Sequence, residues 1–339
     1  MKSTASDIRI IVDAMGGDYA PHYVVEGAVQ AVQESQGRFA VTLVGQKDRI
    51  DEELRKFPTS EQLSVAHASE VIDMHDAPNA ALKTKRDSSI TVGVTMHREG
   101  KGDAFVSAGN TGAVLSASTL ILGRIKGVSR PTIGALIPTE SGKCFLVDAG
   151  ANVDCRPRHL FEFGVMGSIY VGAMVNTENP SIGLLSIGEE DIKGNEASLE
   201  ALGLFRKSGL NFFGNVEGRD ILQGKVDVVV CDGFVGNILL KFGESVPSFF
   251  KAKFKRFAAK NVMNKLSVLV ARSGMRTVMK ELDYQEHGGV PLLGVNGVSI
   301  IGHGGSTPKA IKNMIFRAEE FIRRGVNTKI EEAMKRFNG

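Results

Sequence analysis

The chain has 339 residues, of which 42% are hydrophobic and 23% are charged, and its formal net charge is +3 at pH 7. This length suits about two domains or one large α/β unit, and so small a net charge gives no reason to expect a nucleic-acid partner. Three cysteines without a CxxC pair favour a reduced, cytoplasmic compartment, and no apolar run approaches the roughly 20 residues of a membrane-spanning helix.

Short apolar runs alternate with longer segments through most of the chain, and this alternation predicts strands and helices in turn. Strands are expected at residues 8–14, 39–44, 63–67, 104–106, 131–138, 144–147, 181–187, 227–231 and 298–301. Helices are expected at residues 46–57, at 160–175 and, as one basic amphipathic segment that closes the chain, at 308–337. The alternation predicts an α/β fold with a doubly wound, mostly parallel sheet.

The alternation stops in residues 242–284, where a long helical stretch is expected. We expect residues 1–241 and 285–339 to form the α/β core, as one unit or as two lobes around a cleft, and residues 242–284 to form a helical arm. The arm is basic and carries phenylalanines at helical spacing. The lysines of such a helix suit an anionic membrane surface or an acidic protein, whereas its phenylalanines better suit a dimer interface. The basic residues expected at this contact are Lys251, Lys255, Arg256, Lys260 and Lys265.

The segment from Asp103 to Leu122 is expected to form a strand, a tight turn and a helix of small residues. Glycine in such a turn lets the backbone approach a ligand, and the free N–H groups of a helix start attract anions. We therefore expect a phosphate to bind at Ser107, Asn110, Thr111 and Gly112. The alternative is an ordinary strand-to-helix turn.

Polar residues follow six of the expected strands. Because ligands bind beyond the carboxyl ends of parallel strands, we expect these ends to leave one edge of the sheet and share one cleft. Seven further substrate-binding residues are expected beside the four residues of the turn. Six follow strand ends, and Lys83 lies in a polar connector at residues 73–89. The seven are Asp13, Asp18, Lys83, Asn152, Glu189, Asn195 and Asn237. For Asp18 and Asn237, helix capping is an equally good explanation. Lys193 and Lys241 are the cations nearest to strand ends, and Arg130 is a further candidate.

Several common sites are missing from the sequence. It has no GxxxxGK[ST] motif and no GxSxG motif, which disfavours a P-loop kinase and a serine acyl-enzyme. The closest approach to GxGxxG ends in threonine at residue 307, and the seven histidines show no zinc-ligand spacing. We therefore expect neither a metal nor a cofactor.

Taken together, long segments of the chain resemble the bacterial phosphate acyltransferases of phospholipid synthesis, also called acyl-ACP:phosphate acyltransferases. The matching segments are DAMGGDYAP (13–21), SAGNTGA (107–113), RPTIGALIP (130–138), LVDAGANVDC (146–155), IGEEDIKGN (187–195), DVVVCDGFVGNILLK (227–241), and GGVPLLGVNG with HGGS (288–306). The family usually has arginine where this chain has Lys83, and it often has HGSS where this chain has Gly305.

The resemblance implies a three-layer α/β/α sandwich similar to phosphotransacetylase and isocitrate dehydrogenase. It implies transfer of a long-chain acyl group from acyl carrier protein to inorganic phosphate, with the acyl-phosphate passing to a membrane glycerol-3-phosphate acyltransferase. It also implies a cytoplasmic homodimer that attaches peripherally to the inner face of the membrane.

This reaction gives four residues expected catalytic roles. Lys193 or Lys241 would neutralise the oxyanion of the tetrahedral intermediate, and Asp232 would orient Lys241 or a turn. His303 would protonate the leaving thiolate, although a buried, hydrogen-bonded histidine is the competing interpretation. The rival functions are a decarboxylating dehydrogenase, a CoA-dependent phosphotransacetylase and a non-catalytic membrane-surface scaffold.

Overall fold

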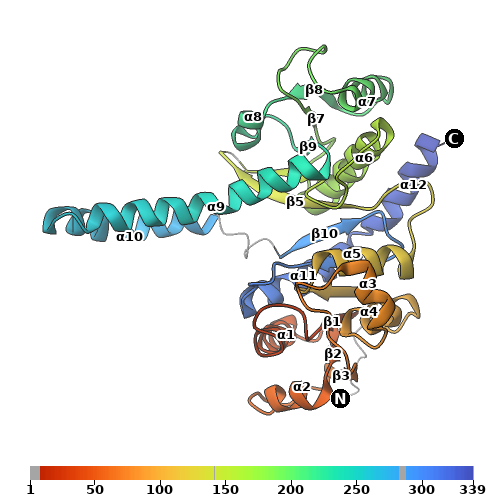
Figure 1. Cartoon of the computed structure of the whole chain (residues 1–339), viewed down its shortest axis with the longest axis vertical. Coiled ribbons are helices and arrows are strands. Elements are labelled where there is room, and N and C mark those ends of the chain that lie inside the picture. Colours follow the sequence, from red (N-terminus) through yellow and green to blue (C-terminus); the bar gives the residue numbers. More distant parts are fainter. Residues whose placement is uncertain (1–7, 141, 282–287, 339) are drawn as a thin grey trace.

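The computed structural model describes residues 8–140, 142–281 and 288–338. All its strands join one 11-stranded sheet, and helices cover both faces of that sheet (Figure 1). The strands are β1 (Ile8–Asp13), β2 (Phe39–Gly45), β3 (Leu63–His67), β4 (Ala104–Ser107), β5 (Thr132–Thr139), β6 (Gly142–Val147), β7 (Ile182–Leu185), β8 (Phe212–Val216), β9 (Val228–Val230), β10 (Val290–Leu293) and β11 (Ser299–Ile301).

The helices alternate with these strands over most of the chain. They are α1 (His22–Ser35), α2 (Lys47–Leu54), α3 (Pro78–Thr84), α4 (Ser89–Arg98), α5 (Thr111–Ala117) with the π-helical turn η1 (Ser118–Leu122), α6 (Pro157–Met174), α7 (Glu196–Lys207), α8 (Gly218–Gln223), α9 (Gly233–Ala258), α10 (Val262–Glu281), α11 (Pro308–Arg323) and α12 (Val326–Asn338).

The first strand shows why the sheet is covered on both faces. Successive side chains of a strand point to opposite faces. In β1, Ile10 and Val12 pack into one hydrophobic core, which also contains residues of α1, α6, α11 and α12. Ile11 packs into a second core, together with residues of α3, α4 and α5. The predicted three-layer α/β/α fold is therefore confirmed.

The centre of the sheet contains three antiparallel pairings. The strand order is β3-β2-β1-β4-β11-β10-β5-β6-β9-β7-β8. Pairing is antiparallel between β11 and β10, between β10 and β5, and between β5 and β6, and it is parallel everywhere else. An odd number of reversals makes β6, β9 and β7 run opposite to β1, β4 and β11. The carboxyl ends of these two groups therefore leave opposite edges of the sheet, and the expectation of one common edge is wrong.

The helix α5 and its continuation η1 lead from one of these edges to the other. They begin just after Ser107, at the carboxyl end of β4. Beyond η1, the carbonyl of Gly123 accepts from the N–H of Asn296 (2.9 Å), and the N–H of Ile125 donates to the carbonyl of Gly294 (3.0 Å). These partners follow β10 at the edge where β5 begins and β6 ends. One helical segment thus connects the ends of the first strand group with those of the second.

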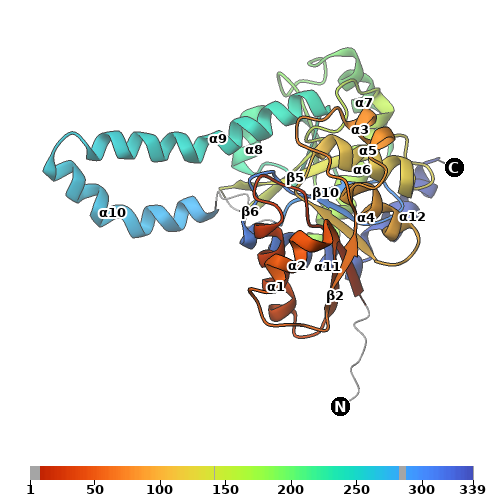
Figure 2. The ribbon, with the colours of Figure 1, turned by 60° about the horizontal axis from the view of Figure 1, so that its bottom comes forward.

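The helices α9 and α10 form a hairpin that projects from the rest of the molecule (Figure 2). A long helical stretch was expected from residue 242, but α9 begins at Gly233 and crosses that position without a break. The chain turns back between Ala258 and Val262. The last part of the expected stretch, up to Tyr284, lies outside the described residues.

Two other expectations need correction. The closing segment is two helices, because Gly325 takes a positive φ of 62° that ends the regular helix after Arg323. Two strands were not predicted, β8 and β10. Their sequences, FFGNV and VPLL, are short and contain glycine or proline, so neither shows a clear alternating pattern.

His97 connects the end of α4 to the start of β11. Its Nε2 accepts from the N–H of Val298 (3.0 Å), so Nδ1 carries the proton that is donated to the carbonyl of Gly102 (2.8 Å). The neutral ring makes both bonds, and a second proton would remove the acceptor. Burial lowers the pKa of His97 from its usual 6.5, because the charged ring would lose its solvation.

We expect this histidine to make folding pH-dependent. Because its folded pKa is lowered, the unfolded chain binds the proton more readily, so the contribution of His97 is complete above its usual pKa of 6.5 and is lost as the pH falls below it. Urea unfolding between about pH 8 and about pH 5 should show a larger loss of stability for the wild type than for His97→Gln, which cannot titrate. Parallel curves for the two proteins would contradict this assignment.

Candidate active site

The turn that follows β4 is organised by a buried carboxylate. The hydroxyl of Ser107 donates to Oδ2 of Asp13 (2.6 Å), and the N–H of Met15 donates to Oδ1 (3.1 Å). Burial raises the pKa of Asp13, and the Ser107 hydrogen bond opposes that rise. Gly16 and Gly109 meet here, since a Cβ on Gly16 would lie 2.7 Å from the amide nitrogen of Gly109. Both predicted side chains, Asp13 and Ser107, are thus engaged with each other inside the turn.

Asn110 holds the first part of the connector, residues 73–76, over the start of α5. Its Oδ1 caps the helix by accepting from the N–H of Ala113 (3.1 Å). Its Nδ2 donates to the carbonyls of Asp73 (3.1 Å), Met74 (3.3 Å) and Asp76 (3.1 Å). The connector then reaches Gly112, where an added Cβ would lie 2.6 Å from Pro78 Cγ. The amide of Asn110 is therefore occupied by the protein, whereas Thr111 is exposed. Phosphate binding at this turn stays a prediction.

The carboxyl end of β11 approaches the same turn. The N–H of Asp18 donates to the carbonyl of Gly304 (2.8 Å). His303 is exposed, and its Nδ1 accepts from the N–H of Gly305 (3.0 Å), so the competing expectation of a buried histidine is wrong. Lys83 lies on α3 with its side chain in solvent. The structure thus brings Asp13, Asp18, Ser107 and the 303–304 segment together.

A second cluster forms where β6 and β9 end. The buried Asp148 accepts from the N–H groups of Gly150, Ala151 and Asn152 (2.7–3.0 Å), which closes the loop after β6. The side-chain amide of Asn152 donates to the carbonyl of Pro131 (2.8 Å). Burial raises the pKa of Asp148, although these donors oppose the rise.

The start of α9 packs on this loop. Gly233 donates its N–H to the carbonyl of Asn152 (2.7 Å), and Asp232 caps the helix by accepting from the N–H of Val235 (3.0 Å). Asn237 is exposed and borders Gly150, where an added Cβ would lie 3.3 Å away. Capping is therefore what the structure shows for Asp232. One turn further, the exposed Lys241 pairs with Glu244 on its own helix (2.9 Å).

The loop after β7 carries the other predicted lysine. Lys193 is exposed there, and Asn195 caps α7 by accepting from the N–H of Ser198 (2.9 Å). Glu189 accepts from Nζ of Lys225 (2.6 Å), so its carboxylate is already paired. Catalytic or binding roles for these residues stay predictions.

A groove of about 430 Å³ lies between α5–η1 and the segment that leads into β5. We call it the α5–β5 groove. Its lining residues are Asn79, Leu115, Ser116, Thr119, Leu120, Arg124, Ser129, Arg130, Pro131 and Asn152. Of the binding and catalytic residues expected from the sequence, Asn152 is the one found there, joined by the further candidate Arg130. The other polar residues that line it, Asn79, Ser116, Thr119, Arg124 and Ser129, were missed.

The two arginines make the groove electropositive. Arg124 donates from Nη1 to the carbonyl of Ser129, and Arg130 donates from Nη1 to the carbonyl of Asp154 (3.0 Å). Within the described ranges, neither guanidinium has a carboxylate at ion-pair distance. The nearby His159 has a lowered pKa, first because it is buried and second because of the positive charge of Arg130. An arginine fork without a carboxylate partner is suited to bind a phosphate or a carboxylate ligand.

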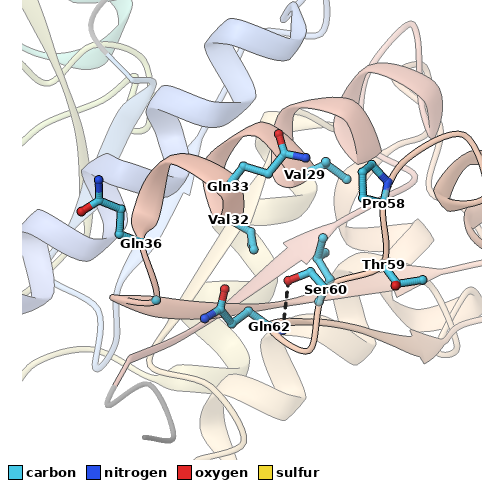
Figure 3. Close-up of a pocket in the computed structure, with 10 residues that line it drawn as sticks. Val29, Val32, Gln33, Gln36, Pro58, Thr59, Ser60 and Gln62 are labelled. Carbon is cyan, nitrogen blue, oxygen red and sulfur yellow. Dashed lines mark hydrogen bonds between the residues drawn. The ribbon is translucent and has the colours of Figure 1, made fainter. Parts of the chain in front are cut away.

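A second hollow, of about 390 Å³, lies between the end of α1 and the start of β3 (Figure 3). It is lined by amide and hydroxyl side chains, including Gln33, Gln36, Ser60 and Gln62, together with apolar residues. None of the described residues that line it is charged. It therefore offers no cation for an anionic ligand.

The arm exposes both its basic and its apolar residues. Lys251, Lys255, Arg256, Lys260 and Lys265 are all exposed. So are its large apolar side chains, which are Phe242, Phe249, Phe250, Phe254, Phe257, Val262, Met263, Leu266, Leu269 and Val270.

No helix among the described residues is long and apolar enough to cross a bilayer. Within the same ranges, no group of three or more His, Cys, Asp or Glu side chains is arranged to hold a metal ion.

Asn110 gives a test of how the start of α5 is built. Asn110→Asp keeps the capping oxygen but leaves three carbonyls without their donor, so we expect a loss of about 1–3 kcal/mol in the free energy of unfolding. The control is Asn195→Asp, because Asn195 also caps a helix, and we expect that change to cost under about 0.5 kcal/mol. Equal losses in urea unfolding would show that the connector is not held by Asn110.

Comparison with known proteins places these features in a family. The sequence profile of the family described as "Fatty acid synthesis protein" matches residues 8–329. A phosphate acyltransferase of Acetivibrio thermocellus is 47% identical over 325 residues, covering 95% of each chain. One from Geobacter sulfurreducens is 45% identical over 329 residues, covering 97% of this chain and 94% of its own.

Solved structures share the fold at low sequence identity. A phosphotransacetylase from Streptococcus pyogenes has a TM-score of 0.60 at 17% identity, covering 92% of this chain and 93% of its own. A 4-hydroxythreonine-4-phosphate dehydrogenase from Klebsiella pneumoniae has a TM-score of 0.53 at 12% identity, covering 94% and 99%. At such identity these structures show the fold alone. The curated relatives and the family profile together show that this chain belongs to the fatty acid synthesis protein family whose members are named phosphate acyltransferases.

Proposed function

We propose that this acyltransferase moves a long-chain fatty acyl group from the thioester of acyl carrier protein to inorganic phosphate, giving an acyl-phosphate for phospholipid synthesis. The relatives named phosphate acyltransferases support the acceptor and the reaction type. The observation that carries the proposal is the α5–β5 groove, where Arg124 and Arg130 meet without a carboxylate partner among the described residues. We place the phosphate against these two side chains and not at the turn after β4, where the Ser107 hydroxyl and the Asn110 amide already bond to other parts of the protein.

The chemistry needs a held nucleophile and no activated side chain. An oxygen of phosphate attacks the thioester carbonyl carbon, and the carbonyl oxygen becomes the oxyanion of a tetrahedral intermediate. The carbon–sulfur bond then breaks, its electron pair leaves on sulfur, and the new carbon–oxygen bond remains in the acyl-phosphate. Arginine forks orient phosphate by paired hydrogen bonds, which supplies the positioning that such a reaction requires.

The oxyanion role assigned to a strand-end lysine remains part of the proposal. Lys193 or Lys241, which follow strands that end at the groove's edge of the sheet, would neutralise the oxyanion. His303 follows β11, which ends at the opposite edge, so we do not assign it to the thiolate of the same intermediate. None of the three lines the α5–β5 groove. Lys241 is held by an exposed pair with Glu244, which is worth only about 0–1 kcal/mol, so release from that pair is no obstacle.

The arm supplies the contacts with larger partners. Acyl carrier proteins are acidic, so the exposed lysines of the arm suit a fast, salt-sensitive encounter with one. The same lysines and the exposed phenylalanines also suit peripheral attachment to an anionic membrane, where a glycerol-3-phosphate acyltransferase would receive the product. The phenylalanines further suit the interface of a homodimer.

The donor can be tested directly. Purified protein, inorganic phosphate and palmitoyl-ACP should yield palmitoyl-phosphate without added metal or nicotinamide, and palmitoyl-CoA should be the poorer donor. The variant with Lys251→Glu, Lys255→Glu and Arg256→Glu should lose about tenfold in rate with palmitoyl-ACP while its rate with palmitoyl-CoA stays unchanged. The fraction of the same variant that is recovered with anionic vesicles measures membrane attachment. This measurement separates membrane attachment from docking of the carrier protein. Intact behaviour in both assays would remove the arm from either role.

The phosphate site has its own test. Arg130→Ala and Arg124→Ala should each raise the KM for phosphate about 10- to 100-fold, because each removes a charge-assisted hydrogen-bond donor. Arg219→Ala is the control, since Arg219 is an exposed arginine of α8 paired with Glu217 and lies outside the groove. A KM for phosphate that stays at the wild-type value in both groove variants would place the phosphate elsewhere.

A further inference from the structure

A buried carboxylate stands behind the α5–β5 groove. Glu162 of α6 is only 1% exposed. Its Oε2 accepts from the N–H of Ser129 (2.8 Å), and its Oε1 accepts from the hydroxyl of Ser129 (2.8 Å) and from Nε of Arg158 (3.1 Å). Both oxygens are therefore hydrogen-bonded, and two of the three bonds go to one residue of the groove wall.

Ser129 is linked to both groove arginines. Its carbonyl accepts from Nη1 of Arg124, and its chain neighbour is Arg130. The segment between η1 and β5 has no regular structure, and it contains two glycines at positive φ, Gly123 (80°) and Gly127 (93°). Backbone bonds of Gly123 and Ile125 to residues 294–296 hold its first part. The part that follows, up to Ser129, has backbone conformations to lose, and Glu162 anchors it at Ser129.

The anchor comes from a rigid part of the core. Most of α6 is buried, and its neighbours Phe161 and Phe163 belong to the main hydrophobic core. A carboxylate in such a place is costly unless its oxygens are satisfied, and here the N–H and the hydroxyl of Ser129 do much of this. An apolar residue in place of Glu162 would pack α6 equally well, but it could not hydrogen-bond to the segment that carries the two arginines.

We propose that Glu162 is a positioning residue for the α5–β5 groove: by fixing Ser129 it sets where Arg124 and Arg130 present their guanidinium groups to the anion. This inference rests on the proposed function, in which that anion is phosphate. Displacing a binding group by about 1 Å is enough to weaken a site strongly, so loss of the anchor should be felt in phosphate binding before it is felt in the chemical step.

The test compares two variants around the same carboxylate. Glu162→Gln keeps the size of the side chain, but it removes the negative charge and leaves one acceptor oxygen for the three donors that now share two. We expect its KM for phosphate to rise about tenfold, with kcat at saturating phosphate within about twofold of wild type. Arg158→Met removes the ion pair to Glu162 and leaves both Ser129 bonds. It should lower the melting temperature while the KM for phosphate stays at the wild-type value.

A binding measurement makes the result independent of turnover. The rise in melting temperature that inorganic phosphate produces in the wild type should shrink in Glu162→Gln and persist in Arg158→Met. Ser129→Ala, which removes one of the two bonds, should give a smaller shift in the same direction, and it stands in if Glu162→Gln does not fold.

The outcomes separate this inference from the proposal on which it rests. If Arg124→Ala and Arg130→Ala raise the KM for phosphate but Glu162→Gln only lowers stability, then Glu162 stabilises the core without positioning the arginines, and the inference is wrong. If the two arginine variants leave the KM unchanged, the phosphate site itself is misplaced.

Discussion

The pairing of β5, antiparallel to β10 on one side and to β6 on the other, sets where the candidate ligands of this protein meet. Because β5 and β6 are antiparallel, the amino end of β5 lies beside the carboxyl end of β6. Arg130 and Pro131, which precede β5, therefore reach Asn152, which follows β6, and the Asn152 amide donates to the Pro131 carbonyl. A parallel pair would have put these residues at opposite edges of the sheet.

Charge decides which of the exposed cations is suited to an anion. The guanidinium groups of Arg124 and Arg130 are oriented by neutral carbonyls, and neither pairs with a carboxylate among the residues that the structure describes. At an effective dielectric constant of about 20, a unit charge at about 4 Å from a phosphate oxygen contributes about 4 kcal/mol. Lys225 already faces Glu189 at 2.6 Å and Asp220 at 3.5 Å, so part of its charge is neutralised within the fold. A pair of arginines that share one groove is the stronger electrostatic site.

Much of the fold could be predicted from the sequence, because apolar strands buried on both faces give continuous hydrophobic runs. Residues 10–12 of β1 and Val228–Val230 of β9 are such runs, and both lie in strands of the sheet. The direction of a strand has no such signature. β5 runs parallel to β11 on the far side of β10, and it is the antiparallel pairing of β5 with β6 that reverses β6, β9, β7 and β8. Reasoning from carboxyl ends therefore found Asn152 but gave no reason to weigh Arg124, which follows a helix rather than a strand. The sequence singled out Asn110 as a phosphate ligand, but its three bonds to the carbonyls of Asp73, Met74 and Asp76 depend on a contact distant in sequence.

The helix α9 links the groove to the surroundings of the protein, and its geometry limits what the arm can do. It starts on the carbonyl of Asn152 and runs 26 residues to Ala258, which is about 39 Å of helix. A surface bound near the tip is thus held well away from the arginines. The phenylalanines along α9 are exposed, so an acyl chain lying on them would keep one side in water, and each methylene left unburied forgoes about 0.8 kcal/mol. This geometry fits an arm that acts as a spacer between the groove and a second surface better than an arm that acts as a channel for the acyl chain. The second surface must then cover the apolar side chains that the arm leaves exposed.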